Sequence, residues 1–269
     1  MNITFIGGGN MAGALISGLT SQGHPPAALR VVEISPEGRS RLQQQYGVAT
    51  FEQMDAKALE CDLLVLAVKP QQLREVAAQL QGKVDGKLVI SIAAGIRAPD
   101  LARWLGGHQQ LVRAMPNTPA MIQSGITGLY ALPGVTDTQK QQAESVLKAV
   151  GTVVWLDSEA QMDAITAVSG SGPAYAFYFM EALESAALEF GFAADAARSL
   201  AVETFLGSAK LAAGSDESLA TLRARVTSKG GTTERALLSM ESATVKTHIV
   251  RAIQAAAERS RELGEELGK

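Results

Sequence analysis

The chain has 269 residues, of which 46% are hydrophobic and 19% charged, and its 24 basic and 27 acidic side chains give a net charge of −3. This composition excludes a disordered chain, and a balanced charge without a basic stripe argues against a nucleic-acid binder. The single cysteine, Cys61, excludes an internal disulfide and suits a reducing compartment. No targeting segment or apolar run of roughly 20 residues is visible, so we expect a cytoplasmic protein that binds no membrane.

The first 155 residues alternate between strand and helix patterns. After the first apolar segment, Met11, Leu15 and Leu19 recur at spacings of four, which predicts one buried helical face. A polar helix is predicted over residues 39–46. Strands that alternate with helices form βαβ units, so we predict an α/β fold with a Rossmann-type doubly wound sheet. The predicted strands are Ile3–Ile6, Val31–Val32, Leu63–Val68, Leu88–Ala94 and Leu111–Val112.

The pattern changes after Leu156, and no convincing strand follows Met162. Alanine, leucine, glutamate and arginine dominate this part, and Val245, Ile249 and Ile253 share one helical face. We therefore predict two domains. Residues 1–157 form the Rossmann domain that binds a dinucleotide, and residues 158–269 form an all-helical C-terminal domain.

A glycine-rich turn follows the first predicted strand and opens the first predicted helix. Its sequence from Gly7 to Ala12 fits G-x-G-x-x-A, a permitted form of the dinucleotide fingerprint. A glycine at position 9 lets the backbone approach a pyrophosphate, which the helix N-terminus attracts. A purely structural glycine turn is the alternative. The cofactor-binding residues predicted here are Gly7, Gly8, Gly9, Asn10 and Met11.

The choice between NADPH and NADH depends on the end of the second strand. Glu33 lies roughly 20 residues beyond the fingerprint, where an acidic side chain bonds the ribose hydroxyls of NAD. Ser35 and Arg39 follow, and both side chains suit a 2′-phosphate. We favour NADPH bound by Ser35 and Arg39, with NADH as the alternative.

Six segments occur along the chain in the order "IGGGNMAGAL" (6–15), "AVKP" (67–70), "SIAAG" (91–95), "AMPNTPA" (114–120), "SGSGPAY" (169–175) and "VTSKGGTT" (226–233). Taken together, they resemble the pyrroline-5-carboxylate reductase family. This resemblance implies reduction of 1-pyrroline-5-carboxylate to L-proline by hydride transfer from NAD(P)H, the last step of proline biosynthesis. It also implies homodimers that form through the C-terminal domain and assemble into larger rings, with each site shared between two chains.

Three of these segments follow predicted strands, and ligands of open parallel sheets bind outside the carboxyl ends of the strands. The resemblance implies that the turns of "AVKP" and "SIAAG" line the nicotinamide-ribose half of the cofactor site, and Asn117 on the next strand-end turn is expected to contact the cofactor. A solvated lysine is the alternative for Lys69, and a plain Asx turn is the alternative for Asn117. The predicted cofactor contacts are Ala67, Val68, Lys69, Pro70, Ala93, Ala94, Gly95 and Asn117.

The segment "VTSKGGTT" carries two adjacent glycines just before a helix, an arrangement that binds a carboxylate. The resemblance makes Thr233 the catalytic residue, with its hydroxyl on the ring nitrogen of the imine. Lys229 departs from the family, which usually has proline there, and an ordinary glycine loop is the alternative for the segment. The residues expected to shape the carboxylate pocket are Val226, Ser228, Gly230, Gly231 and Thr232.

The turn "SGSGPAY" precedes a long predicted helix, and the resemblance places it and Ser171 near the substrate. Glu159 lies where relatives often carry an acidic residue close to the substrate. A helix start with core aromatic side chains is the alternative for the turn. His24, His108 and His248 lack metal-ligand spacing, so no metal is predicted.

Two other functions remain open. A β-hydroxyacid dehydrogenase has the same architecture but uses a lysine on the helix after the middle glycine turn, where this chain has Pro173 to Ala176. A silent cofactor-binding protein is the second alternative. Turnover of a hydroxyacid, or cofactor binding without turnover of any imine, would distinguish them.

Overall fold

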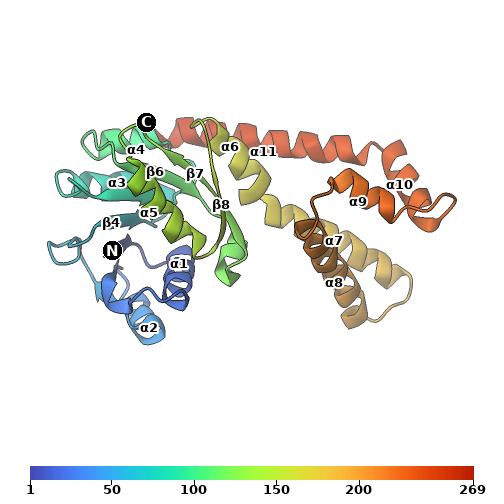
Figure 1. Cartoon of the computed structure of the whole chain (residues 1–269), viewed down its shortest axis with the longest axis horizontal. Helices are drawn as coiled ribbons and strands as arrows, with labels where there is room; N and C mark the ends of the chain where they lie inside the picture. The colour runs from blue at the N-terminus through green and yellow to red at the C-terminus, as the bar shows by residue number, and fades with distance from the viewer. The chain divides into compact units, whose positions relative to one another are not determined.

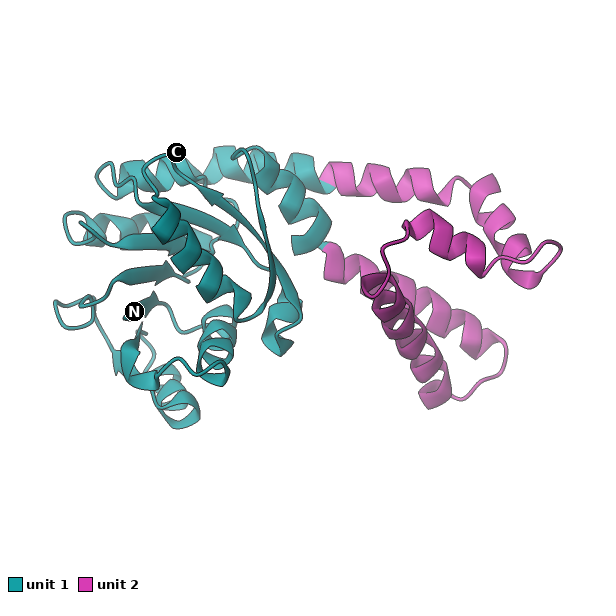
Figure 2. Cartoon of the chain, in the orientation of Figure 1, with its two compact units in different colours: residues 1–171, 256–269 teal, residues 172–255 magenta.

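The structure is a computed structural model that describes residues 1–269. The chain forms two compact units, residues 1–171 with 256–269, and residues 172–255 (Figure 2). The first unit extends beyond residue 157 because helix α6 (Gln161–Ile165) packs on its sheet, where a Cβ on Gly128 would lie 2.7 Å from the Ile165 side chain. The domain division predicted at residue 157 stays a prediction about function.

One eight-stranded sheet organises the first unit, with strand order β3-β2-β1-β4-β5-β6-β7-β8 (Figure 1). All neighbouring strands are parallel except β6 and β7, which are antiparallel. The predicted Rossmann-type fold is confirmed. The strands are β1 (Ile3–Ile6), β2 (Leu29–Val32), β3 (Ala49–Phe51), β4 (Leu63–Leu66), β5 (Leu88–Ser91), β6 (Leu111–Met115), β7 (Gly125–Ala131) and β8 (Gly151–Trp155).

Two apolar cores lie on the two faces of the sheet, because successive strand residues point to opposite faces. Ile3 and Phe5 of β1 join one core, which also contains side chains of α1, α2 and α5, and Ile6 joins the other with α3 and α4. The predicted helical face of α1 is buried at Leu15 and Leu19. The helices are α1 (Asn10–Ser21), α2 (Pro36–Tyr46), α3 (Pro70–Leu80), α4 (Ala98–Trp104) and α5 (Asp137–Lys148), with 3-10 turns η1 (Pro26–Ala28) and η2 (Thr118–Ile122).

The second unit contains helices only, as the sequence predicts. Helices α7 and α8 pack against each other, and α11 continues from this unit into the first. Many large apolar side chains are exposed on the unit, among them Tyr178 at 71% and Leu211 at 73% of their area. None of the helices is both long and apolar enough to cross a membrane. The helices are α7 (Gly172–Glu189), α8 (Ala194–Ala213), α9 (Leu219–Arg225), α10 (Thr232–Ser242) and α11 (Val245–Leu267).

Candidate functional site

The glycine turn between β1 and α1 has the geometry that a pyrophosphate needs. Gly7 has a φ of +99°, and a Cβ there would lie 2.8 Å from the carbonyl oxygen of Ala67. A Cβ on Gly9 would meet no atom within 4 Å, so packing within the chain does not require this glycine. No side chain caps the N-terminus of α1, whose first backbone N–H groups and helix dipole suit an anion. The site therefore fits the phosphates of a dinucleotide.

A cleft of about 630 Å³ opens beside this turn, at the carboxyl ends of β1, β2 and β4. The segments after β2, β3 and β4 supply its other walls. Of the predicted cofactor residues, the structure brings Gly7, Gly8, Gly9, Ala67, Val68 and Lys69 together around this cleft, with Glu33.

The β2–α2 turn is held by Glu33. One carboxylate oxygen accepts a hydrogen bond from the N–H of Gly8 at 2.9 Å, and the other accepts one from the N–H of Ser35 at 2.9 Å. The Ser35 hydroxyl donates to Glu37 at 2.7 Å and accepts from the N–H of Gly38 at 3.1 Å, so it caps α2. Arg39 donates to the carbonyl oxygens of Glu33 and Ile34 at 2.8 and 2.9 Å. Both residues predicted to bind a 2′-phosphate thus have partners within the chain.

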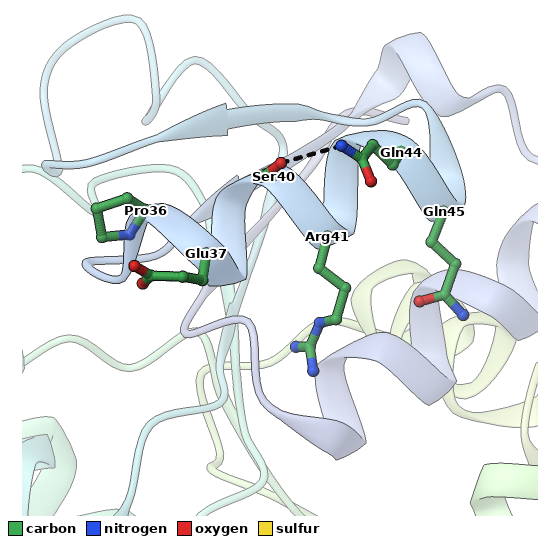
Figure 3. Close-up of a pocket in the computed structure, with 6 residues that line it drawn as sticks. All are labelled: Pro36, Glu37, Ser40, Arg41, Gln44 and Gln45. Carbon is green, nitrogen blue, oxygen red and sulfur yellow. Dashed lines mark hydrogen bonds between the residues drawn. The ribbon is translucent and has the colours of Figure 1, made fainter.

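Helix α2 also carries a basic side chain that sequence reasoning missed. Arg41 donates to the carbonyl oxygen of Gly8 at 2.8 Å and helps to line a second hollow, of about 320 Å³, together with Gly9 and Asn10. Arg41 also lines a separate depression on the surface of α2, and Figure 3 shows it projecting from this helix beside Gln45. Its charge lies next to the proposed pyrophosphate position. No local pattern indicates this, because Arg41 follows Gly8 by 33 residues.

The turns after β5 and β6 make close contacts with other segments of the first unit. Gly95 has a φ of +75°, and a Cβ there would lie 3.2 Å from Leu267 at the end of α11. Asn117 is 9% exposed; its amide donates to the carbonyl oxygen of Ser169 at 3.2 Å and accepts from the N–H of Ile126 at 3.0 Å. Asn117 therefore joins the "MPNTPA" and "SGSG" segments. The predicted cofactor residues outside the 630 Å³ cleft are Asn10, Met11, Ser35, Arg39, Pro70, Ala93, Ala94, Gly95 and Asn117.

Glu159 lies in an ion pair. Its carboxylate binds the guanidinium of Arg113 and accepts a hydrogen bond from the N–H of Ala98 at 3.3 Å. Burial raises the pKa of Glu159, and the charge of Arg113 offsets part of that rise. Ser171 ends a π-helical turn, η3 (Thr166–Gly170), where its N–H donates to Thr166. These contacts give both residues a structural role, and substrate binding by either stays a prediction.

In the second unit, the segment from Val226 to Thr233 contains the turn between α9 and α10 and the first two residues of α10. Gly230 has a φ of +73°, and its N–H donates to the carboxylate of Glu234 at 2.6 Å. Gly231 precedes α10 in an extended conformation, and no side chain caps that helix. Thr233 is exposed in the first turn of α10. The N–H groups of both glycines have partners within the chain, since that of Gly231 donates to the carbonyl oxygen of Ser228 at 3.0 Å. The N–H groups without a side-chain cap are those of the first turn of α10, which also carries the Thr233 hydroxyl.

Comparisons with known proteins agree on one family. The family model described as pyrroline-5-carboxylate reductase dimerisation matches residues 159–263, and the one described as NADP oxidoreductase, coenzyme F420-dependent, matches residues 2–95. Pyrroline-5-carboxylate reductase from Pseudomonas aeruginosa is 43% identical over 268 residues, which is 99% of this chain and 98% of the relative.

Solved structures give the same result. The pyrroline-5-carboxylate reductase of Coxiella burnetii superposes with a TM-score of 0.93 at 43% identity, covering 97% of this chain and 98% of the other. That of Plasmodium falciparum, solved with NADP bound, has a TM-score of 0.86 at 28% identity, and each chain is covered to 98%.

Proposed function

Because the chain belongs to the pyrroline-5-carboxylate reductase family and reduces 1-pyrroline-5-carboxylate to L-proline with NAD(P)H, we propose that its segment 226–233 holds the substrate. This reaction is the last step of proline biosynthesis. The arrangement around Gly230 and Gly231 is the observation that carries the proposal. The backbone N–H groups at the start of α10 are not capped by a side chain, and such a terminus attracts a carboxylate.

The proposed binding mode assigns each half of the substrate to different atoms. Gly231, Thr232, Ser228 and their neighbours Val226 and Gly230 shape the pocket for the carboxylate. The Thr233 hydroxyl, in the first turn of α10, hydrogen-bonds the ring nitrogen. Exposure of this segment in the single chain supports access of a small ligand to it. We propose Glu159 and Ser171 as further substrate contacts.

For this reaction the protein mainly has to position the cofactor and the imine. The reduced nicotinamide, when bound, supplies the hydride, and a protonated imine is already a good acceptor. Thr233 orients the ring nitrogen and holds its proton, while the glycine turn fixes the cofactor, so that donor and acceptor meet at about 3–3.5 Å. We propose the cofactor contacts predicted above, with NADPH accepted at the β2–α2 turn, and a cytoplasmic location, which the single free Cys61 supports.

The chain is an oligomer that forms through its dimerisation region, residues 159–263. We propose further that dimers assemble into a ring, and that each site combines the cofactor cleft of one chain with the 226–233 segment of its neighbour. Mixing two impaired variants tests the shared site. A Gly9→Ala chain and a Thr233→Ala chain, refolded together, should regain activity because a mixed dimer contains one intact site. Absence of recovery would show that each chain builds its own site.

The activity itself is tested by following oxidation of NADPH and NADH by the purified protein with 1-pyrroline-5-carboxylate. A parallel reaction contains a β-hydroxyacid and oxidised cofactor. Loss of reduced cofactor with the imine alone supports the reductase. Turnover of the hydroxyacid alone would favour a dehydrogenase, and cofactor binding without turnover would favour a silent binding protein.

A further inference from the structure

The end of helix α11 belongs to the first unit, where it packs against the turn after β5. Leu267 packs on the apolar core that contains side chains of α3 and α4. A Cβ on Gly95 would lie 3.2 Å from Leu267 and 3.7 Å from Leu263. Gly264 is buried, and a Cβ there would lie 2.9 Å from the side chain of Arg97. The last turns of α11 are therefore in close contact with this turn.

Two arginine side chains bind the backbone at the end of α11. Arg103 of α4 donates to the carbonyl oxygen of Gly268 at 2.7 Å, and Figure 1 shows the C-terminus beside α4. Arg74 of α3 donates to the carbonyl oxygen of Lys269 at 2.5 Å, and its guanidinium lies 5.8 Å from the ring centre of Trp104. The last carbonyl oxygens of a helix have no partner within it and carry the negative end of its dipole, so both arginines stabilise this end of α11.

Helices α3 and α4, which hold the end of α11, each follow a turn with predicted cofactor contacts. The segment 67–70 lies between β4 and α3, and Ala67 to Lys69 line the 630 Å³ cleft. The segment 91–95 leads from β5 toward α4. The N–H of Ile92 donates to the carbonyl oxygen of Leu66 at 3.1 Å, so the two turns are neighbours at the carboxyl edge of the sheet. The end of α11 therefore binds the elements that follow both turns.

Within the segment 91–95, Ala94 is the only exposed residue. Ala93 and Gly95, on either side of it, are buried. Gly95 has a φ of +75°, which glycine adopts far more readily than other residues, and this is the residue that Leu267 covers. The backbone that presents Ala94 to solvent is thus packed from behind by α11.

We propose that Leu267 is a positioning residue for the nicotinamide half of the cofactor, on which it acts only through Gly95 and the turn after β5. The end of α11 keeps this turn in the conformation that contacts the nicotinamide ribose. The proposal rests on the proposed cofactor contacts of Ala93, Ala94 and Gly95. The segments after β2 and β3 build the other end of the cleft, where the adenosine half binds in the proposed function, and they provide an internal reference.

Two probes titrated by calorimetry into the whole enzyme test the proposal. NADPH reaches both ends of the cleft, whereas adenosine 2′,5′-bisphosphate contains the adenosine end alone. Leu267→Ala should weaken NADPH by about 2- to 30-fold, the range for residues that act on a site without touching its ligand, and leave the bisphosphate unchanged. A change in folding alone would alter the fraction of binding-competent protein and not the ratio of the two affinities. Leu267→Met keeps the apolar volume and should retain the wild-type ratio.

Two further variants complete the test. Glu266→Gln is the matched control, because Glu266 is exposed on the same turn of α11 and pairs with Arg259. It should leave both probes unchanged. Arg103→Gln removes the hydrogen bond to Gly268 and should act in the same direction as Leu267→Ala.

Unchanged NADPH affinity in Leu267→Ala, an equal loss of both probes, or the same selective loss in Glu266→Gln would overturn the proposal. If Leu267→Ala does not fold, Arg103→Gln decides by the same comparison. Failure of the wild type to bind NADPH would overturn the dinucleotide site and this proposal with it, whereas the selective results above concern the role of α11 alone.

Discussion

Arg113 of β6 and Glu159 of the segment before α6 form an ion pair inside the first unit, with the Arg113 side chain 4% exposed and that of Glu159 20% exposed. The second oxygen of the Glu159 carboxylate is buried without a hydrogen-bond partner. The pair links β6 to the turn that leads into α6. A buried guanidinium depends on such a partner, because it cannot lose its charge.

We therefore expect Glu159→Gln to lower the free energy of unfolding by about 3–5 kcal/mol, the range for breaking a buried pair. Replacing both residues by leucine should cost less than the single change, because no charge is then left uncompensated. Chemical denaturation of the three proteins measures this. Because Glu159 is also a proposed substrate contact, Glu159→Gln should raise the KM for the imine as well. A raised KM with unchanged stability would contradict the structural role of the ion pair.

The burial of His108 predicts that the stability of the protein depends on pH. It is 8% exposed, its Nε2 lies 3.1 Å from the carbonyl oxygen of Lys87, and burial lowers the pKa of its imidazole. The unfolded chain therefore binds a proton more readily, and stability should fall as the pH drops through about 6.5 toward the lowered pKa. Denaturation at about pH 7.5 and about pH 5.5 measures the slope. His108→Gln should lose less stability than the wild type on acidification. An identical loss of stability would show that His108 is not its cause.

Gly7 and Gly9 should respond differently to alanine. Gly9 has a φ of −69° and open space at the Cβ position, so Gly9→Ala should change stability by less than about 1 kcal/mol. Its methyl group would project into the proposed phosphate site and should weaken NADPH and NADH alike. Gly7→Ala places a side chain at a φ of +99° against a carbonyl oxygen and should destabilise the fold by about 1–3 kcal/mol.

Calorimetric titration of the cofactors and denaturation of both variants separate these effects. Full cofactor affinity in a folded Gly9→Ala protein would contradict the phosphate position that we propose.

The exposed apolar surface of the second unit predicts an oligomer that charged substitutions in this surface would weaken. Leu211 on α8 is 73% exposed in the single chain, so Leu211→Lys should cost the chain itself little. Charge in a dimer interface should shift the protein toward monomers, which sedimentation measures. Lys210→Gln, one residue away and already polar, is the control. Phe177 on α7, which is 61% exposed, provides a second variant, Phe177→Lys. An unchanged mass for both lysine variants would place the interface on other side chains.

Thr233→Ala tests the proposed catalytic hydroxyl. Because Thr233 is exposed, the fold should be unaffected, while kcat/KM for the imine should fall about 10- to 100-fold, the value of a hydrogen bond to a charged group. Thr233→Ser keeps the hydroxyl and should retain most activity. Steady-state kinetics and denaturation of both variants are the measurements. Equal activity of the alanine and serine variants would show that the hydroxyl has no role.

Much of the fold was predictable because the decisive patterns are local. The apolar strand at Ile3–Ile6, the turn at Gly7 and the spacing of Leu15 and Leu19 all act within one βα unit, and the structure confirms them. Strands β3, β7 and β8 were not predicted. In β8 half-buried and exposed residues alternate and none is fully buried, and β3 has only three residues. The antiparallel direction of β7 depends on its pairing with β6, which no local pattern specifies.

By itself, the sequence determined the order of the elements, the glycine turn between β1 and α1, the helical character of the second unit and the ordered segments that indicate the reaction. These properties depend on neighbouring residues or on residue types along the chain. The tertiary structure decided where side chains separated by tens of residues find partners. It directed Glu33 to the N–H of Gly8, Arg41 to the Gly8 carbonyl oxygen and Glu159 to Arg113. Hydrogen bonds and charges act over a few ångströms in space, so only the folded chain could assign these partners.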